Sequence, residues 1–148
     1  MILFLPDVNV WVALSDATHI HREDSSNWLR LLSQESQVIF CRFTQIGLLR
    51  LLTNQTVMGE ETLTLKQAWG VYDQWLEDPR IDLHPEPSGL EAAFRETTRP
   101  LGARTASKWV GDCYLLAYAD ACAATLVTFD KGLLELARKH SYSAISPA

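Results

Sequence analysis

ILFLPDVNVWVAL, residues 2–14, joins a short apolar run to a longer one through the pair Pro6-Asp7. The run Ile2–Leu5 is too short for a helix and ends at a proline, so it predicts a buried β-strand. A helix is predicted to begin soon afterwards, near Val8. This order leaves an acidic residue, Asp7, between the end of a buried strand and the start of a helix.

Strands and helices are predicted to alternate along the rest of the chain. Further strands are predicted at Gln37–Cys41, Ile81–Leu83, Thr125–Phe129 and Ser143–Ile145. Helices are predicted over Asn27–Leu32, from Thr44 onward, and over Thr62–Glu77, Leu90–Thr97, Cys113–Ala123 and Lys131–Lys139, and Arg99–Ser107 is predicted as a loop. Strands separated by helices predict an α/β fold in which helices cover both faces of a mostly parallel sheet of four or five strands.

Two of these helices carry a regular apolar spacing that predicts a face buried in the core. The first face consists of Phe43, Ile46, Leu49 and Leu52, and the second of Leu65, Ala68, Trp69, Tyr72 and Leu76. Because the aromatic residues of the second helix largely follow the helical period, we interpret them as core or subunit interface rather than as platforms for nucleic-acid bases.

The composition is that of one folded domain spanning residues 1–148. Hydrophobic residues make up 47% of the chain and charged residues 21%, which is ordinary for a globular protein. The net charge of −5 argues against nonspecific coating of DNA, which needs many basic contacts, but a nuclease whose acidic residues bind metal remains open. Three cysteines without C-x-x-C spacing argue against a disulfide framework or a zinc ribbon.

Nothing in the sequence predicts export or membrane insertion. The apolar run at Met1–Leu5 lacks a preceding basic segment, and no stretch approaches the roughly 20 apolar residues that a membrane span requires. We therefore expect a cytoplasmic protein.

Three aspartates are predicted to meet at one edge of the sheet. Asp7 and Asp130 each follow a buried strand and precede a helix, which places them at the carboxyl ends of the strands, where ligands bind in open α/β folds. Asp112 lies near the start of the helix that leads back to the strand Thr125–Phe129, so it should reach the same edge. Each aspartate alone is also a good helix N-cap, which is the structural alternative to a functional role.

Convergence of the three carboxylates favours a metal site. Carboxylates a few Å apart raise one another's pKa unless they share a cation. Mg²⁺ suits a site made only of oxygen atoms, and it retains water molecules that can attack a phosphate. His19 and His21 form an H-x-H pair, but two residues apart on a helix diverge, so we interpret them as packing or surface residues.

Four blocks of the sequence resemble the PIN-domain nucleases, and specifically the VapC-type toxins of bacterial toxin–antitoxin pairs. The blocks are LPDVNVWVAL (residues 5–14), FTQIGLLRLLTN (43–54), KWVGDCYLLAYA (108–119) and LVTFDKGL (126–133). They follow in order along nearly the whole chain and end in T-F-D-K-G.

The resemblance implies a three-layer α/β/α sandwich and an endoribonuclease that requires Mg²⁺ or Mn²⁺. It also implies a homodimer that is inhibited by a small VapB-type antitoxin. By position, Asp7, Asp112 and Asp130 match three acidic residues of the family. Asn9 matches a small polar position beside the first acid, and Thr128 is a candidate for a similar supporting role.

Gln45 departs from the family pattern, because many relatives carry Glu in this block. An amide oxygen can ligate a metal or hold a metal-bound water, but it carries no negative charge and cannot act as a base. The departure leaves two hypotheses open: an active ribonuclease, or a catalytically weak protein of the same fold that binds RNA or regulates.

Basic residues are candidates for binding the RNA backbone. The segment from residue 95 to residue 108 has four basic residues and one acidic residue, directly before Asp112. It can hold RNA phosphates at the mouth of the site, or it can be a solvated loop. The candidates are Arg99, Arg104 and Lys108, together with Arg42 and Arg50, which flank Gln45.

Overall fold

The computed structural model describes all residues from Met1 to Ala148 and has a single five-stranded sheet at its centre. Every strand pairing is parallel, and the strand order is β3-β2-β1-β4-β5. The strands are β1 (Leu3–Pro6), β2 (Gln37–Phe40), β3 (Ile81–Leu83), β4 (Thr125–Val127) and β5 (Ala144–Ile145). The predicted sheet is thereby confirmed, and the strand that carries Asp7 lies between the other two long apolar runs.

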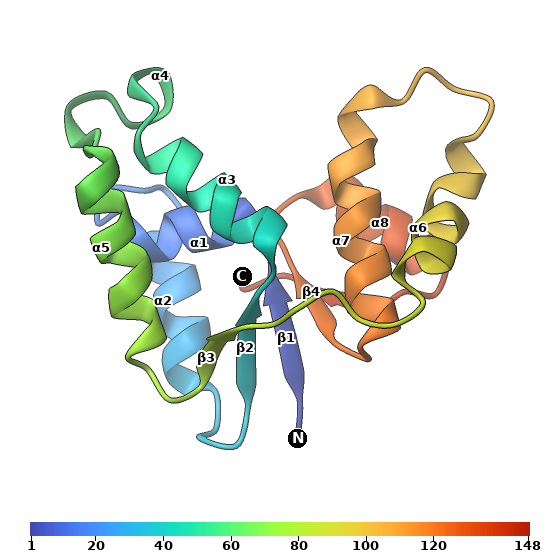
Figure 1. Ribbon diagram of the computed structural model, residues 1–148, viewed down its shortest axis with the longest axis horizontal. Helices are drawn as coiled ribbons and strands as arrows, with labels where there is room; N and C mark the ends of the chain where they lie inside the picture. Colours follow the sequence, from blue (N-terminus) through green and yellow to red (C-terminus); the bar gives the residue numbers. More distant parts are fainter.

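Helices cover both faces of the sheet, which makes the three layers that the sequence predicted (Figure 1). One layer contains α1 (Val8–Ser15), α2 (Arg22–Leu31), α3 (Arg42–Leu52), the short α4 (Gln55–Met58) and α5 (Leu65–Leu76). The other contains α6 (Leu90–Thr98), α7 (Val110–Ala121) and α8 (Lys131–Lys139). Single 3-10 turns occupy Gly59–Glu61, Arg99–Leu101 and Ser107–Trp109; the second lies within the predicted loop, and the third begins at the last residue of that loop.

The alternation of side chains along the strands divides the interior into two cores. In β2, Val38 and Phe40 face the core beneath α1, α2, α3 and α5, whereas Ile39 faces the core beneath α6, α7 and α8. In β4, Val127 faces the first core and Leu126 the second. Successive strand residues point to opposite faces, so continuously apolar strands are required for a sheet buried on both sides.

The boundaries of several elements differ from the prediction, among them those of α2, α3 and β4. Helix α2 begins at Arg22 rather than near Asn27. Helix α3 begins at Arg42, because Thr44 does not open the helix but closes a capping box, in which its hydroxyl accepts from the backbone N–H of Cys41 at 3.1 Å. Strand β4 ends at Val127, before the two residues that lead to Asp130.

The predicted buried face of α3 is partly wrong. Leu49 and Leu52 are buried, but Phe43 is 41% exposed and Ile46 is also exposed. The buried face instead includes the polar residue Gln45, whereas the apolar residues Phe43 and Ile46 on either side of it face the surface.

The predicted buried face of α5 is also partly wrong. Ala68 and Tyr72 are buried against α3, whereas Leu65 is 58% and Trp69 is 42% exposed. The helix therefore buries a narrower stripe than its sequence suggests, and it leaves two large apolar side chains on the surface.

None of the helices is long and apolar enough to cross a lipid bilayer.

Candidate active site

Asp7 is the most deeply buried acidic residue of the predicted site. It directly follows β1, where its backbone N–H donates to the carbonyl of Val127 at 2.9 Å, and it caps α1 by accepting from the N–H of Val10 at 3.0 Å. Its second carboxylate oxygen accepts a hydrogen bond from the hydroxyl of Thr128. One oxygen is thus held by the first turn of α1, and the other by the residue that follows β4.

Thr128 links Asp7 to Asp130. While its hydroxyl donates to Asp7, the same oxygen accepts from the backbone N–H of Asp130 at 3.0 Å. Asp130 in turn caps α8 by accepting from the N–H of Leu133 at 3.1 Å. Because Thr128 is fully buried, its hydroxyl has no solvent to bond with and must satisfy these two partners.

Asp112 approaches the same edge from α7, as the sequence predicted. It lies in the first turn of that helix and is partly buried. Its carboxylate makes no hydrogen bond or ion pair, but the charges of Asp130 and Asp7 both act on it. Asp112 therefore lies close enough to Asp7 and Asp130 for their charges to affect its ionisation.

The three carboxylates repel one another and are poorly hydrated. Burial raises the pKa of Asp7 to about 6, and the charge of Asp130 adds to this rise, while hydrogen bonds from Thr128 and Val10 oppose it. Burial also raises the pKa of Asp112 to about 6, with further contributions from the charges of Asp130 and Asp7. None of the four ion pairs in the protein involves any of these aspartates.

This donor set fits a hard divalent cation such as Mg²⁺. It offers only oxygen atoms, it is negatively charged, and it lacks a basic side chain that would neutralise it. The carboxylates are near enough to interact by charge, although no three side chains of His, Cys, Asp or Glu stand as close together as a ready-made ligand set.

We predict that Thr128→Val weakens catalysis through its effect on Asp7. The substitution keeps the shape of the side chain but removes the hydroxyl, so Asp7 loses a hydrogen bond that lowers its pKa. Loss of such a supporting contact typically costs about 10- to 100-fold in activity or metal affinity. The rising limb of the pH profile for metal-dependent cleavage should also move to higher pH, whereas Thr128→Ser should behave like the wild type. An unchanged pH profile in Thr128→Val would contradict the link.

The structure gives the Gln45 side chain a different partner from the one that the sequence predicted. Gln45 is buried, and its amide oxygen accepts from the guanidinium of Arg42 at 2.6 Å. The same side chain lies beside the hydroxyl of Tyr72, whose pKa is raised by burial and lowered by a hydrogen bond with Gln45. No hydrogen bond joins Gln45 to the aspartates.

We therefore predict that Gln45→Glu leaves the Mg²⁺ concentration for half-maximal RNA cleavage unchanged. The new carboxylate would pair with Arg42, the group that already donates to the amide oxygen. Titration of both proteins with Mg²⁺ in the same cleavage assay measures this directly. A clear fall in the Mg²⁺ requirement would instead show that position 45 acts on the metal.

Asn9 acts on Asp7 through its backbone rather than its side chain. The Asn9 side chain is exposed and makes no hydrogen bond, while its backbone N–H contributes to lowering the pKa of Asp7. The expected supporting role therefore belongs to the first turn of α1, whose free N–H groups face the carboxylate.

The predicted basic residues divide into paired and free cations. Arg99 is paired with Glu96 at 3.2 Å, and the guanidinium of Arg42 donates to Gln45. Arg50, Arg104 and Lys108 make no ion pair. The unpaired cations are the better candidates for RNA phosphates, because they do not have to break an existing contact to bind them.

Sequence reasoning missed two aromatic residues at the site, Phe43 and Trp109. Phe43 was assigned to the core by its helical spacing, and Trp109 was not assigned a role. Phe43 lies against the backbone of Gly111, and Trp109 lies against Gly132. The signal in the sequence was a glycine close to each aspartate, Gly111 before Asp112 and Gly132 after Asp130. The contacts of these glycines with the rings could not be predicted, because they join segments far apart in the chain.

The family comparison matches most of the chain. The model of the family described as PIN domain matches residues 4–139. Ribonuclease VapC41 of Mycobacterium tuberculosis, from strain CDC 1551 / Oshkosh and from strain H37Rv, is 41% identical over 132 residues, which cover 86% of this chain and 89% of the relative.

Two solved structures have a similar fold. VapBC2 from Rickettsia felis, bound to a DNA fragment from its promoter, superposes with a TM-score of 0.70 at 16% identity, covering 98% of both chains. VapBC-1 from nontypeable Haemophilus influenzae also gives 0.70, at 11% identity, covering 99% of this chain and 98% of the other. At these identities the likeness concerns the fold alone.

Proposed function

This chain belongs to the PIN-domain family, and from that premise we propose that it is a metal-dependent endoribonuclease of the VapC type, the toxin of a toxin–antitoxin pair. The observation that carries the proposal is the group of Asp7, Asp112 and Asp130 at the carboxyl edge of the sheet, where their charges interact without any ion pair. Clustered carboxylates with no basic partner cost stability, so their presence favours a function that uses a cation.

Asp7, Asp112 and Asp130 are the residues that would hold Mg²⁺ or Mn²⁺. When bound, the cation supplies positive charge that stabilises a phosphodiester transition state and acidifies water. Thr128 would keep the Asp7 carboxylate in position, and the buried location of Asp7 would limit competing hydration. Arg50, Arg104 and Lys108 would bind the phosphates of the RNA on either side.

The partners proposed for the protein are RNA, a small VapB-type antitoxin and a second copy of the same chain. The relative from Mycobacterium tuberculosis is named a ribonuclease, and two proteins of similar fold were solved as VapBC complexes. The exposed Leu65 and Trp69 on α5 offer an apolar surface for a homodimer. We further propose that residues 1–148 form one nuclease domain that acts in the cytoplasm.

A cleavage assay with the purified protein tests the proposal. End-labelled single-stranded RNA should be cut internally when Mg²⁺ or Mn²⁺ is present and remain intact in EDTA, and the antitoxin encoded beside the gene should stop cleavage when it is added. Internal cleavage that persists in EDTA would rule out the metal site. Absence of cleavage with either metal would rule out the enzyme.

A further inference from the structure

Two aromatic rings lie beside the carboxylates, each against a glycine. A Cβ atom on Gly111, which precedes Asp112, would stand 2.9 Å from the tip of the Phe43 ring. A Cβ atom on Gly132 would stand 3.2 Å from the Trp109 indole and 3.3 Å from a carboxylate oxygen of Asp130. Both rings therefore lie so close to the backbone that any residue larger than glycine at position 111 or 132 would force the ring or the backbone to move.

The two rings reach the carboxyl edge of the sheet from different elements. Phe43 is in the first turn of α3, which follows β2, whereas Trp109 packs on the first turn of α8, which follows β4. Strand β1 lies between β2 and β4, and Asp7 is at its carboxyl end. One ring is thus carried by the helix that follows β2, and the other packs on the helix that follows β4, the two strands that pair with β1.

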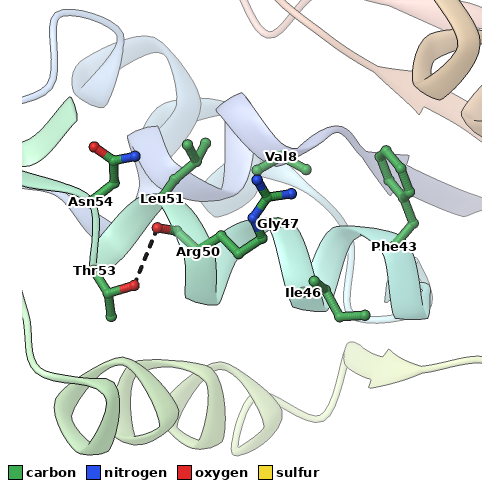
Figure 2. Close-up of a pocket in the computed structure, with 8 residues that line it drawn as sticks. All are labelled: Val8, Phe43, Ile46, Gly47, Arg50, Leu51, Thr53 and Asn54. Carbon is green, nitrogen blue, oxygen red and sulfur yellow. Dashed lines mark hydrogen bonds between the residues drawn. The ribbon is translucent and has the colours of Figure 1, made fainter. Parts of the chain in front are cut away.

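Each ring is accompanied by a free cation. Phe43 and Arg50 line the same surface groove of about 580 Å³, where Figure 2 shows Phe43 at one end, Asn54 at the other and Arg50 between them. On the opposite side, the ammonium of Lys108 lies 5.6 Å from the centre of the Trp109 ring, and Arg104 lines a hollow of about 240 Å³ together with Trp109.

We propose that Phe43 and Trp109 are base-stacking residues of this site, and that each ring holds one unpaired base of the bound strand. The inference rests on the proposed ribonuclease function. Aromatic faces combined with basic side chains are the arrangement that binds single strands, because every base offers a face for stacking and every nucleotide a phosphate. Bases within a double helix are stacked on one another and have no free face for a protein ring.

The partial exposure of Phe43 supports this assignment over simple packing. A phenylalanine that served only the core would gain most from complete burial, yet 41% of Phe43 remains exposed beside the carboxylates. Trp109 is likewise only partly buried, and it contacts the cation Lys108 rather than the apolar core.

Binding measurements on leucine variants test the proposal without relying on cleavage. Phe43→Leu and Trp109→Leu keep an apolar contact with the glycines but remove the ring. Fluorescence anisotropy in EDTA gives the affinity of each variant for a short labelled RNA and for versions in which one nucleotide at a time is abasic. Trp28→Leu is the control, since Trp28 is a partly buried tryptophan on α2 that lies against Phe4 and lines neither hollow.

We expect each leucine variant to lose about tenfold in affinity for the single strand, as is typical when one stacked base loses its partner. Removing the base that stacks on a given ring should lower the affinity of the wild type by a similar factor. The leucine variant that already lacks this ring should bind the abasic strand and the intact strand equally well. Trp109→Phe should recover most of the affinity, and Trp28→Leu should bind like the wild type.

Three results would overturn the inference. The first is that loss of a ring and loss of its base lower the affinity independently, so that the two factors multiply. The others are equal affinity for duplex and single-stranded RNA, or no measurable RNA binding by the wild type. Failure of the ribonuclease proposal would be seen separately, as absence of metal-dependent cleavage while the stacking contacts remain detectable in the binding data.

Discussion

Asp7→Asn, Asp112→Asn and Asp130→Asn are each expected to reduce metal-dependent RNA cleavage by about a thousandfold or more while the protein remains folded. Each substitution replaces a charged oxygen ligand with a neutral amide, and a loss of about 4 kcal/mol of transition-state stabilisation corresponds to this factor. Asparagine is as good a helix N-cap as aspartate, so the capping contacts of α1 and α8 should survive.

Initial rates with end-labelled RNA at saturating Mg²⁺ measure this effect, and circular dichroism checks the fold. Asp120→Asn is a suitable control, because Asp120 is exposed at the far end of α7 and should be dispensable. In cells, expression of the wild type should arrest growth, and the three substitutions should relieve the arrest. Full cleavage by all three purified variants would show that these carboxylates are not the active site.

The second large effect concerns the stability of the metal-free protein. A carboxyl with a higher pKa in the folded than in the unfolded protein binds more protons when folded, in the pH range between the two values. The free energy of unfolding therefore falls as the pH rises through that range. For Asp7 the range runs from the ordinary aspartate value to about 6. The stability lost across it is about 3 kcal/mol, at about 1.4 kcal/mol for each pKa unit.

Asp7→Asn should remove this cost. Above the raised pKa, at about pH 7.5, the metal-free variant should be more stable than the metal-free wild type by up to about 3 kcal/mol, and near pH 4 the two should be about equal. The hydrogen bond to Val10 can be kept by the amide oxygen, and Thr128 can accept from the amide nitrogen. Urea unfolding at both pH values measures the difference, and the comparison cancels the contributions of titrating groups that do not interact with Asp7; Asp112, whose pKa the charge of Asp7 raises, adds to the difference in the same direction.

Mg²⁺ should stabilise the wild type much more than Asp7→Asn. Binding to the folded state stabilises it, so Mg²⁺ at about pH 7.5 should raise the melting temperature of the wild type but have little effect on Asp7→Asn. Each kcal/mol corresponds to about 2 to 4 °C for a domain of this size. If Asp7→Asn were less stable than the wild type at every pH, the hydrogen bonds of the carboxylate would outweigh its burial, and the repulsion argument would fail.

Local sequence determined the elements and the end of the sheet at which the aspartates lie. Short apolar runs with breakers predicted the strands, and the range Lys131–Lys139 was predicted with the bounds that α8 has in the structure. Asp7 and Asp130 could be placed because a residue that ends a parallel strand and begins a helix has only one edge of the sheet to occupy. These features depend on neighbours in the chain and on burial, both of which can be read from spacing.

The tertiary structure alone decided which side chains meet at that edge. The apolar spacing of α3 placed Phe43 in the core, but the position of α7 brings the ring against Gly111 and leaves it partly exposed. The Gln45 amide accepts a hydrogen bond from Arg42, and Trp109 lies against Gly132 beside Asp130. Periodicity states only that one face of a helix is apolar, whereas the neighbour of each side chain depends on how elements distant in sequence pack together.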